Sequence, residues 1–197
     1  AGSHLLISEA VRGNGSILVN REGVRFANEM WTRDKLSDAI LQQTSKKAFL
    51  VFDQSVRESL SAIENYAQQG LMTSADTPAE LAEALQIPVS AFAETMEKYS
   101  LYQTTGEDKD FQRKAEEMPR PLTEAPYYAI NVEPVIHHTM GGIKINAQAE
   151  VVNQNGKTIP GLYAAGEVTG GVHGGNRLGG NAVADILYGN VSPSGKL

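Results

Sequence analysis

Residues 166–183 read GEVTGGVHGGNRLGGNAV, and this stretch says most about the fold of the chain. Seven glycines fall between Gly166 and Gly180, a density that a regular helix or strand does not tolerate. Glycines let the backbone come close to a flat or anionic ligand, and Arg177 supplies a planar fork for a carboxylate or phosphate. A flexible linker would be rich in Ser and would lack the embedded Leu, Val, His and Arg. The stretch therefore predicts a ligand-binding loop.

The composition is typical of a globular protein. The 197 residues are 41% hydrophobic and 20% charged, so the chain can bury a core. A net charge of −6 without any basic run argues against nucleic acid as a partner. No apolar run reaches membrane-spanning length, so we expect a soluble protein of bacterial type, in cytoplasm or periplasm. The absence of Cys excludes disulfides and thiolate metal sites within this chain.

Local sequence signals predict helices in the first half of the chain and strands in the second. We expect a hairpin over residues 16–28, helices over 34–43, 54–67, 78–85, 89–102 and 178–188, and strands over 48–52, 127–132, 142–145, 150–152 and 161–164. Residues 106–121 are polar and interrupted by Pro, which favours a surface loop. This order of elements predicts an α+β protein with two regions.

Three motifs resemble the flavoproteins of the fumarate reductase/succinate dehydrogenase family. They are SEAVRGNG at 8–15, RFANE at 25–29 with TRD at 32–34, and the glycine-rich run from 167 to 182. They occur in the order of the family, and the resemblance extends over roughly residues 5–187. It is closest to the soluble flavocytochrome c type and to the urocanate and acrylate reductases.

The resemblance implies an α+β capping (clamp) domain over residues 5–126 and the C-terminal part of an FAD-binding α/β domain over 127–188. Residues 1–4 and 189–197 are set apart as a cloning scar and an atypical tail. These flavoproteins grip the FAD pyrophosphate with a strand, G-x-G-x-x-G and a helix, and no G-x-G-x-x-G occurs here. We therefore expect a fragment that lacks the N-terminal dinucleotide-binding unit and is inactive on its own.

The resemblance also implies an activity. With FAD as cofactor, the full-length enzyme would be an oxidoreductase acting on CH–CH bonds of α,β-unsaturated carboxylates, with fumarate reduced to succinate as the leading reaction. The electron donor stays open. A urocanate- or acrylate-type reductase is one alternative, and a folded but inactive module unable to hold FAD is another.

Arg33, in the TRD motif, corresponds to the catalytic acid of the family, with Glu9 and Arg12 as its partners in proton delivery. The pKa of Arg lies far above neutral pH, but the proton acceptor is a carbanion-like centre, which is far more basic than a neutral guanidine. Without the resemblance, Arg33 reads as a structural ion pair with Asp34 or Glu29, and Glu9 with Arg12 as an ordinary pair three residues apart. The motif match favours the catalytic interpretation.

The remaining candidate residues fall into two groups implied by the resemblance. The substrate-binding group, which would hold a dicarboxylate, consists of Ser8, His137 and Arg177. The flavin-binding group consists of His138, Glu167 and the start of the last helix, Gly180, Asn181, Ala182 and Val183. No metal site is expected, because adjacent His side chains point apart in a strand and no carboxylate follows at ligand spacing.

Overall fold

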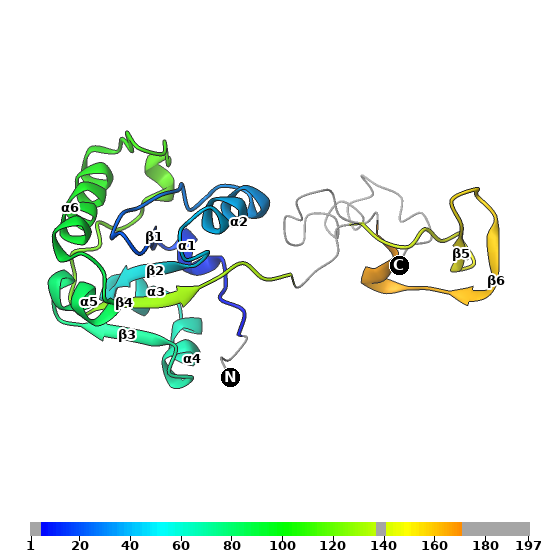
Figure 1. Ribbon diagram of the computed structural model, residues 1–197, viewed down its shortest axis with the longest axis horizontal. Helices are drawn as coiled ribbons and strands as arrows, with labels where there is room; N and C mark the ends of the chain where they lie inside the picture. The colour runs from blue at the N-terminus through cyan, green and yellow to red at the C-terminus, as the bar shows by residue number, and fades with distance from the viewer. Residues whose placement is uncertain (1–4, 137–140, 171–197) are drawn as a thin grey trace. The chain divides into compact units, whose positions relative to one another are not determined.

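The computed structural model describes residues 5–136 and 141–170 and shows a mixed α+β fold (Figure 1). The chain divides into two compact units, Ala1–Pro134 and Val135–Leu197. The elements of the first unit are, in chain order, α1 (Ala10–Gly13), β1 (Ile17–Val19), α2 (Arg33–Leu41), β2 (Ala48–Asp53), α3 (Gln54–Ser59), α4 (Ala62–Gln68), β3 (Met72–Ala75), α5 (Pro78–Leu85), α6 (Val89–Thr105), the 3-10 turn η1 (Ala115–Glu117) and β4 (Tyr127–Val132).

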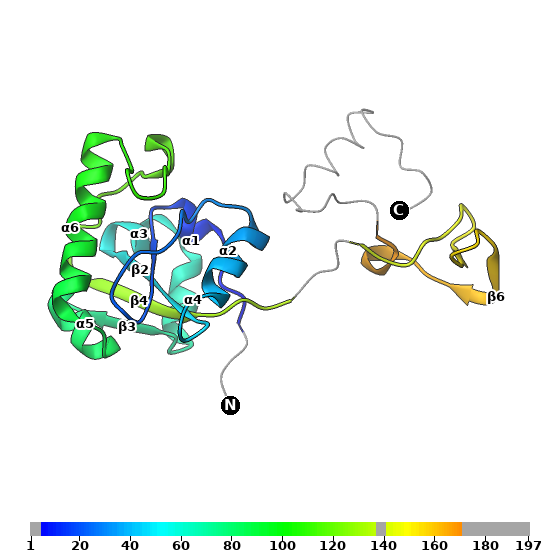
Figure 2. The ribbon, with the colours of Figure 1, turned by 45° about the horizontal axis from the view of Figure 1, so that its top comes forward.

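The first unit is built on a four-stranded antiparallel sheet with the strand order β1-β2-β4-β3. The inner strand β4 pairs with β2, where Ile130 lies opposite Leu50, and with β3, where Ala129 lies opposite Thr73. Helix α3 packs against β2, and α5 packs against β3 and α6 (Figure 2). Every residue of β2 is buried, which explains its unbroken apolar sequence from Ala48 to Phe52.

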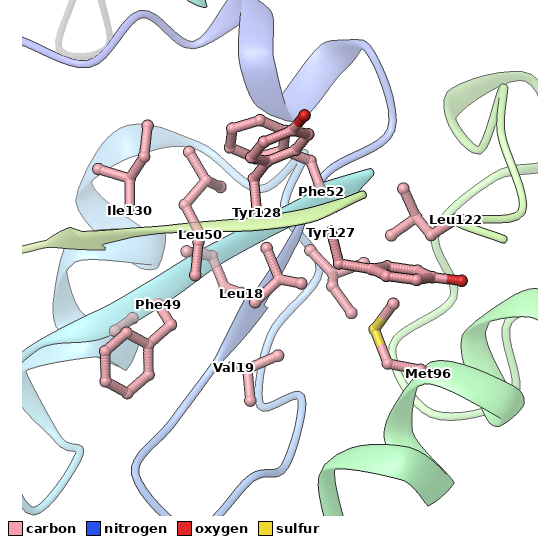
Figure 3. Packing of buried hydrophobic residues seen from close by; sticks show 14 of the residues in the cluster. Leu18, Val19, Phe49, Leu50, Phe52, Met96, Leu122, Tyr127, Tyr128 and Ile130 are labelled. Atoms are coloured by element: carbon pink, nitrogen blue, oxygen red, sulfur yellow. The ribbon is translucent and has the colours of Figure 1, made fainter. Parts of the chain in front are cut away.

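The hydrophobic core occupies both faces of this sheet. Phe52 and Tyr128 lie on one side of the strands and stack with ring centroids 5.6 Å apart, whereas Phe49 lies on the opposite side (Figure 3). Tyr127 points toward Met96 of α6 (Figure 3). Side chains therefore alternate between two buried layers along β2 and β4.

Two predicted strands, 48–52 and 127–132, are confirmed as β2 and β4. The expected hairpin over 16–28 is only partly formed, because its second half makes a single bridge between Val19 and Arg25. The carboxylate of Glu29 accepts the backbone N–H of Leu18 at 3.0 Å and so takes a place that a second strand would fill. Strand β3 was not predicted, and its polar residues Thr73 and Ser74 carry little strand signal.

The predicted helices largely agree with α2, α5 and α6, the last of which runs to Thr105 and ends at Gly106 with φ +72°. The single helix expected over 54–67 is wrong. Leu60 is extended, with φ −143° and ψ 101°, and separates α3 from α4. Ser59 and Ser61 flank this residue, and Ser competes with the helix by bonding to nearby backbone groups.

The surface loop expected over residues 106–121 is also wrong in one respect. The segment has little regular structure, but Asp108, Arg113 and Met118 within it are buried. Asp108 and Arg113 form ion pairs with the residues of the second motif, Arg25 and Glu29. Burial here follows from charge pairing across the fold, which the local polarity of the segment conceals.

The two compact units divide the chain later than the domain boundary expected between residues 126 and 127. Strand β4 begins at Tyr127 and lies inside the sheet of the first unit, so the division falls between Pro134 and Val135. The strand pairs on both sides, and those pairings bind it to the unit that precedes it.

The second unit contains the antiparallel strands β5 (Glu150–Val152) and β6 (Thr158–Tyr163) and the 3-10 turn η2 (Gly166–Thr169). The predicted strand 142–145 is reduced to one bridge from Ile145 to Val151. Gly142 lies against the backbone of Val168, and a Cβ there would overlap the Val168 carbonyl. The predicted helix over 178–188 lies outside the described residues. None of the described helices is long and apolar enough to cross a membrane.

Candidate active site

Arg33 and Glu9 meet at the surface of the first unit although 24 residues separate them in the sequence. Glu9 precedes α1, and Arg33 is the first residue of α2. The guanidinium of Arg33 donates from Nε to one carboxylate oxygen of Glu9 and from Nη2 to the other, the second bond measuring 3.1 Å. This fork-to-fork geometry fixes the guanidinium in one orientation while both side chains stay partly exposed.

Arg12 lies behind this pair. Its Nη2 is 4.0 Å from the Glu9 carboxylate, and its Nη1 donates to the backbone carbonyl of Glu29. The side chain of Arg12 is less exposed than those of Glu9 and Arg33. Glu9 therefore stands between two arginines, one toward the surface and one toward the interior.

The two arginines have different proton affinities. The hydrogen bond with Glu9 raises the pKa of Arg33, whereas desolvation by burial lowers the pKa of Arg12. Burial disfavours a charged guanidinium, and a bound carboxylate favours it. The site thus contains a partly exposed arginine that holds its proton tightly beside a carboxylate and a second arginine that holds its proton less tightly.

Ser8 is exposed next to this group. Its Oγ accepts the backbone N–H of Ala10 at 3.2 Å, and its own N–H donates to the Tyr66 hydroxyl at 3.0 Å. The hydroxyl proton of Ser8 remains available for donation to a ligand, since Oγ acts as an acceptor in the bond that fixes it. The structure therefore brings four predicted residues into one part of the first unit: Ser8, Glu9, Arg12 and Arg33.

The other predicted site residues belong to the second unit. Glu167 lies in η2 and is exposed. The remaining candidates, His137, His138, Arg177, Gly180, Asn181, Ala182 and Val183, lie outside the described residues.

A group of four charged side chains was missed by the sequence analysis. Arg25 donates to both carboxylate oxygens of Glu29, at 2.9 and 2.8 Å, and to Asp108 at 2.8 Å, while Arg113 donates to Glu29 at 3.0 Å. We call these four residues the buried ion network. The four-residue spacing of Arg25 and Glu29 was a signal for one pair only. The carboxylate of Glu29 is thus bound by Arg25 and Arg113. Arg33, whose alternative interpretation was an ion pair with Asp34 or Glu29, forms the ion pair with Glu9 described above.

Comparison with known proteins identifies the family. A family model described as an FAD binding domain matches residues 1–183. The chain is 55% identical over 183 residues to a fumarate reductase (cytochrome) of Shewanella frigidimarina, covering 93% of this chain and 32% of the relative. It is 38% identical to an NADH:acrylate oxidoreductase of Vibrio harveyi (95% and 19% covered) and 35% identical to a urocanate reductase of Eggerthella lenta (97% and 32% covered).

A solved structure agrees with these relatives. The open conformation of a flavocytochrome c3 fumarate reductase matches with a TM-score of 0.78 and 46% identity, covering 94% of this chain and 32% of that one. The chain belongs to the FAD binding domain family, among the flavoproteins of the fumarate reductase/succinate dehydrogenase type, a family whose cofactor is FAD. It spans about a third of the length of the Shewanella relative.

Proposed function

We propose that this chain forms the capping domain and the C-terminal FAD-binding part of a reductase of α,β-unsaturated carboxylates. The observation that carries the proposal is the bidentate pair of Arg33 and Glu9 with Arg12 behind it. The relatives named for fumarate, acrylate and urocanate share this chemistry of reducing an activated C=C bond. The N-terminal dinucleotide-binding unit would lie on a segment outside this sequence, and the isolated chain would be inactive.

Reduction of such a bond adds a hydride to one alkene carbon and a proton to the other. Bound FAD, when reduced, supplies the hydride. In this proposal the guanidinium of Arg33 donates the proton, and its positive charge would stabilise the negative charge that develops on the substrate. After Arg33 gives up its proton, Arg12 would transfer a proton to the Glu9 carboxylate, which would pass it to Arg33 through the hydrogen bonds that join them. Solvent water would then return a proton to Arg12.

Fumarate is the substrate that we propose first. Ser8, His137 and Arg177 would bind the two carboxylates, and of these the structure describes Ser8, with a hydroxyl proton available for donation. Acrylate and urocanate are the alternatives, because relatives with these names match almost the whole chain. A substrate carrying two carboxylates would use both His137 and Arg177.

The cofactor residues proposed here are His138, Glu167 and Gly180, Asn181, Ala182 and Val183. The exposed carboxylate of Glu167 fits a ligand rich in hydroxyl groups, such as the ribityl or ribose part of FAD. Backbone N–H groups at the start of the helix predicted over 178–188 would stabilise negative charge on the flavin ring.

The decisive experiment measures fumarate reduction by the FAD-loaded polypeptide that carries this sequence behind the N-terminal dinucleotide-binding unit. In Arg33→Lys the charge remains but the fork is lost, so kcat should fall by roughly 10²–10⁴ while KM changes little. Glu9→Gln should also lower kcat, because it removes the group that returns the proton. Acrylate and urocanate are assayed beside fumarate to rank the substrates.

Arg57→Lys is the matched control, since Arg57 forms a similar bidentate pair with Glu64 elsewhere in the first unit. It should leave kcat unchanged. Near-normal turnover in both Arg33→Lys and Glu9→Gln would refute the proton route and return Arg33 to a structural role. Absence of activity toward all three substrates, with FAD bound, would refute the proposed function itself.

A further inference from the structure

Arg113 is the most deeply buried arginine among the described residues, at 1% exposure. It lies on the segment between α6 and β4 that was expected to be a surface loop. Its guanidinium makes four hydrogen bonds: Nη1 donates to Ser16 O at 3.1 Å and to Glu29 at 3.0 Å, Nη2 to Arg12 O at 2.8 Å, and Nε to Glu117 O at 2.9 Å. One planar guanidinium thus ties four separate points of the chain together.

Two of these contacts converge on Arg12. Arg113 holds the backbone carbonyl of Arg12, and the backbone carbonyl of Glu29 accepts from the Arg12 side chain. The carboxylate of the same Glu29 is bound by Arg113. Arg12 is therefore fixed at both ends, its main chain directly by Arg113 and its guanidinium through a residue that Arg113 anchors.

The charges of the buried ion network explain why this arrangement is rigid. Two arginines and two carboxylates balance, and the Glu29 carboxylate takes further support from the Leu18 N–H. The ring of Tyr99 lies against both cations, 5.4 Å from Arg25 and 5.9 Å from Arg113. Buried charges persist only where partners satisfy them, so moving any one member leaves another unpaired.

We propose that Arg113 is a positioning residue for proton delivery, which holds Arg12 at the distance from Glu9 that reprotonation requires. The inference rests on the proposed function, because it assigns Arg113 a task within the same proton route. Arg12 stands 4.0 Å from the Glu9 carboxylate, at the limit of an ion pair, so a small displacement breaks the connection. Arg113 itself touches neither Arg33 nor Glu9 in the contacts that define the site, and it acts through Arg12.

The test is a double-mutant cycle with Arg12→Lys and Arg113→Lys in the FAD-loaded polypeptide, with rates normalised to bound flavin. A lysine retains the charge of Arg113 but cannot reach four acceptors with a planar fork. In the wild-type background, Arg113→Lys should lower kcat about 10- to 100-fold, the cost typical of a misplaced catalytic group, with KM within about twofold. In the Arg12→Lys background it should have almost no further effect, because the residue it positions is already lost.

A purely structural role predicts a different pattern. Arg113→Lys would then lower flavin content and thermal stability, and the rate per bound flavin would fall equally in both backgrounds or not at all. Either result overturns the inference. Arg57→Lys serves again as the control.

Glu29→Gln, which keeps the backbone carbonyl of Glu29, replaces Arg113→Lys if that variant does not fold. A smaller fall in kcat for Glu29→Gln that disappears in the Arg12→Lys background supports the inference, and equal effects in both backgrounds overturn it.

The outcomes also separate this inference from the proposed function. If the wild-type polypeptide binds FAD and reduces none of the three substrates, the function fails. If it reduces fumarate, responds to Arg33→Lys and is indifferent to Arg113→Lys, only the positioning role of Arg113 fails.

Discussion

At the scale of single residues, Tyr99 makes the stability of the first unit depend on pH. Burial is the largest cause that raises the pKa of Tyr99, from 10.0 to about 12, and its hydroxyl donates to Gly15 O at 3.2 Å. Between these two values the unfolded chain has released the phenol proton and the folded protein still holds it. Raising the pH therefore favours the unfolded chain, by about 3 kcal/mol over the full interval.

Tyr99→Phe removes this titration while it retains the ring against Arg25 and Arg113. The variant should be less stable than the wild type near neutral pH, by about 1 kcal/mol for the lost hydrogen bond, and should lose less stability between pH 9 and 11.5. Urea unfolding at the two pH values measures both effects. Parallel losses in variant and wild type would show that Tyr99 does not titrate in this interval.

At the scale of elements, α5 owes its start to a few residues. Thr77 accepts the Glu80 N–H at 3.2 Å, and the Glu80 carboxylate accepts the Thr77 N–H at 3.0 Å, with Pro78 as the first helical residue. Thr77→Ala should lower the free energy of unfolding by about 1 kcal/mol. Thr104→Ala, on the exposed side of α6, should change it by a few tenths of a kcal/mol at most. Urea unfolding of the two variants measures the difference. Equal effects would show that the reciprocal hydrogen bonds of Thr77 and Glu80 add no stability of their own.

The same elements show what the sequence can and cannot predict. The cap at Thr77 and the apolar run of β2 are local signals, and both elements appear where they were expected. Strand β3 was missed because it carries polar residues and depends on its partner β4. The segment around Arg113 was misjudged because its burial arises from ion pairs with residues more than 80 positions away.

The candidate site was also predictable only in part from the sequence. Glu9 and Arg12 are close in sequence, but the contact of Glu9 with Arg33 bridges 24 residues and was expected only through the family motifs. No periodicity in the sequence brings these two segments together. The role of the buried ion network behind them became visible only from contacts, since each of its members reads as an ordinary surface charge.

At the scale of the whole molecule, β4 decides where the first unit ends. A polypeptide of residues 5–134 contains all four strands and should unfold cooperatively in urea, whereas one of residues 5–126 lacks the strand between β2 and β3. The shorter polypeptide should show no cooperative transition, because the two ladders that β4 makes, with β2 and with β3, are lost. Circular dichroism during urea titration compares the two, and equal cooperativity would place the boundary back at residue 126.

The inner position of β4 also has a mechanical consequence. The chain leaves the first unit directly from this strand, two residues after Val132, so any pull from the second unit enters at the middle of the sheet. Hydrogen bonds of antiparallel ladders run perpendicular to the strands, so tension along β4 loads both of its ladders in shear, many bonds at once. An edge strand under tension can peel away one bond at a time. The link between the two units is therefore attached to a strand that two ladders hold, one on each side.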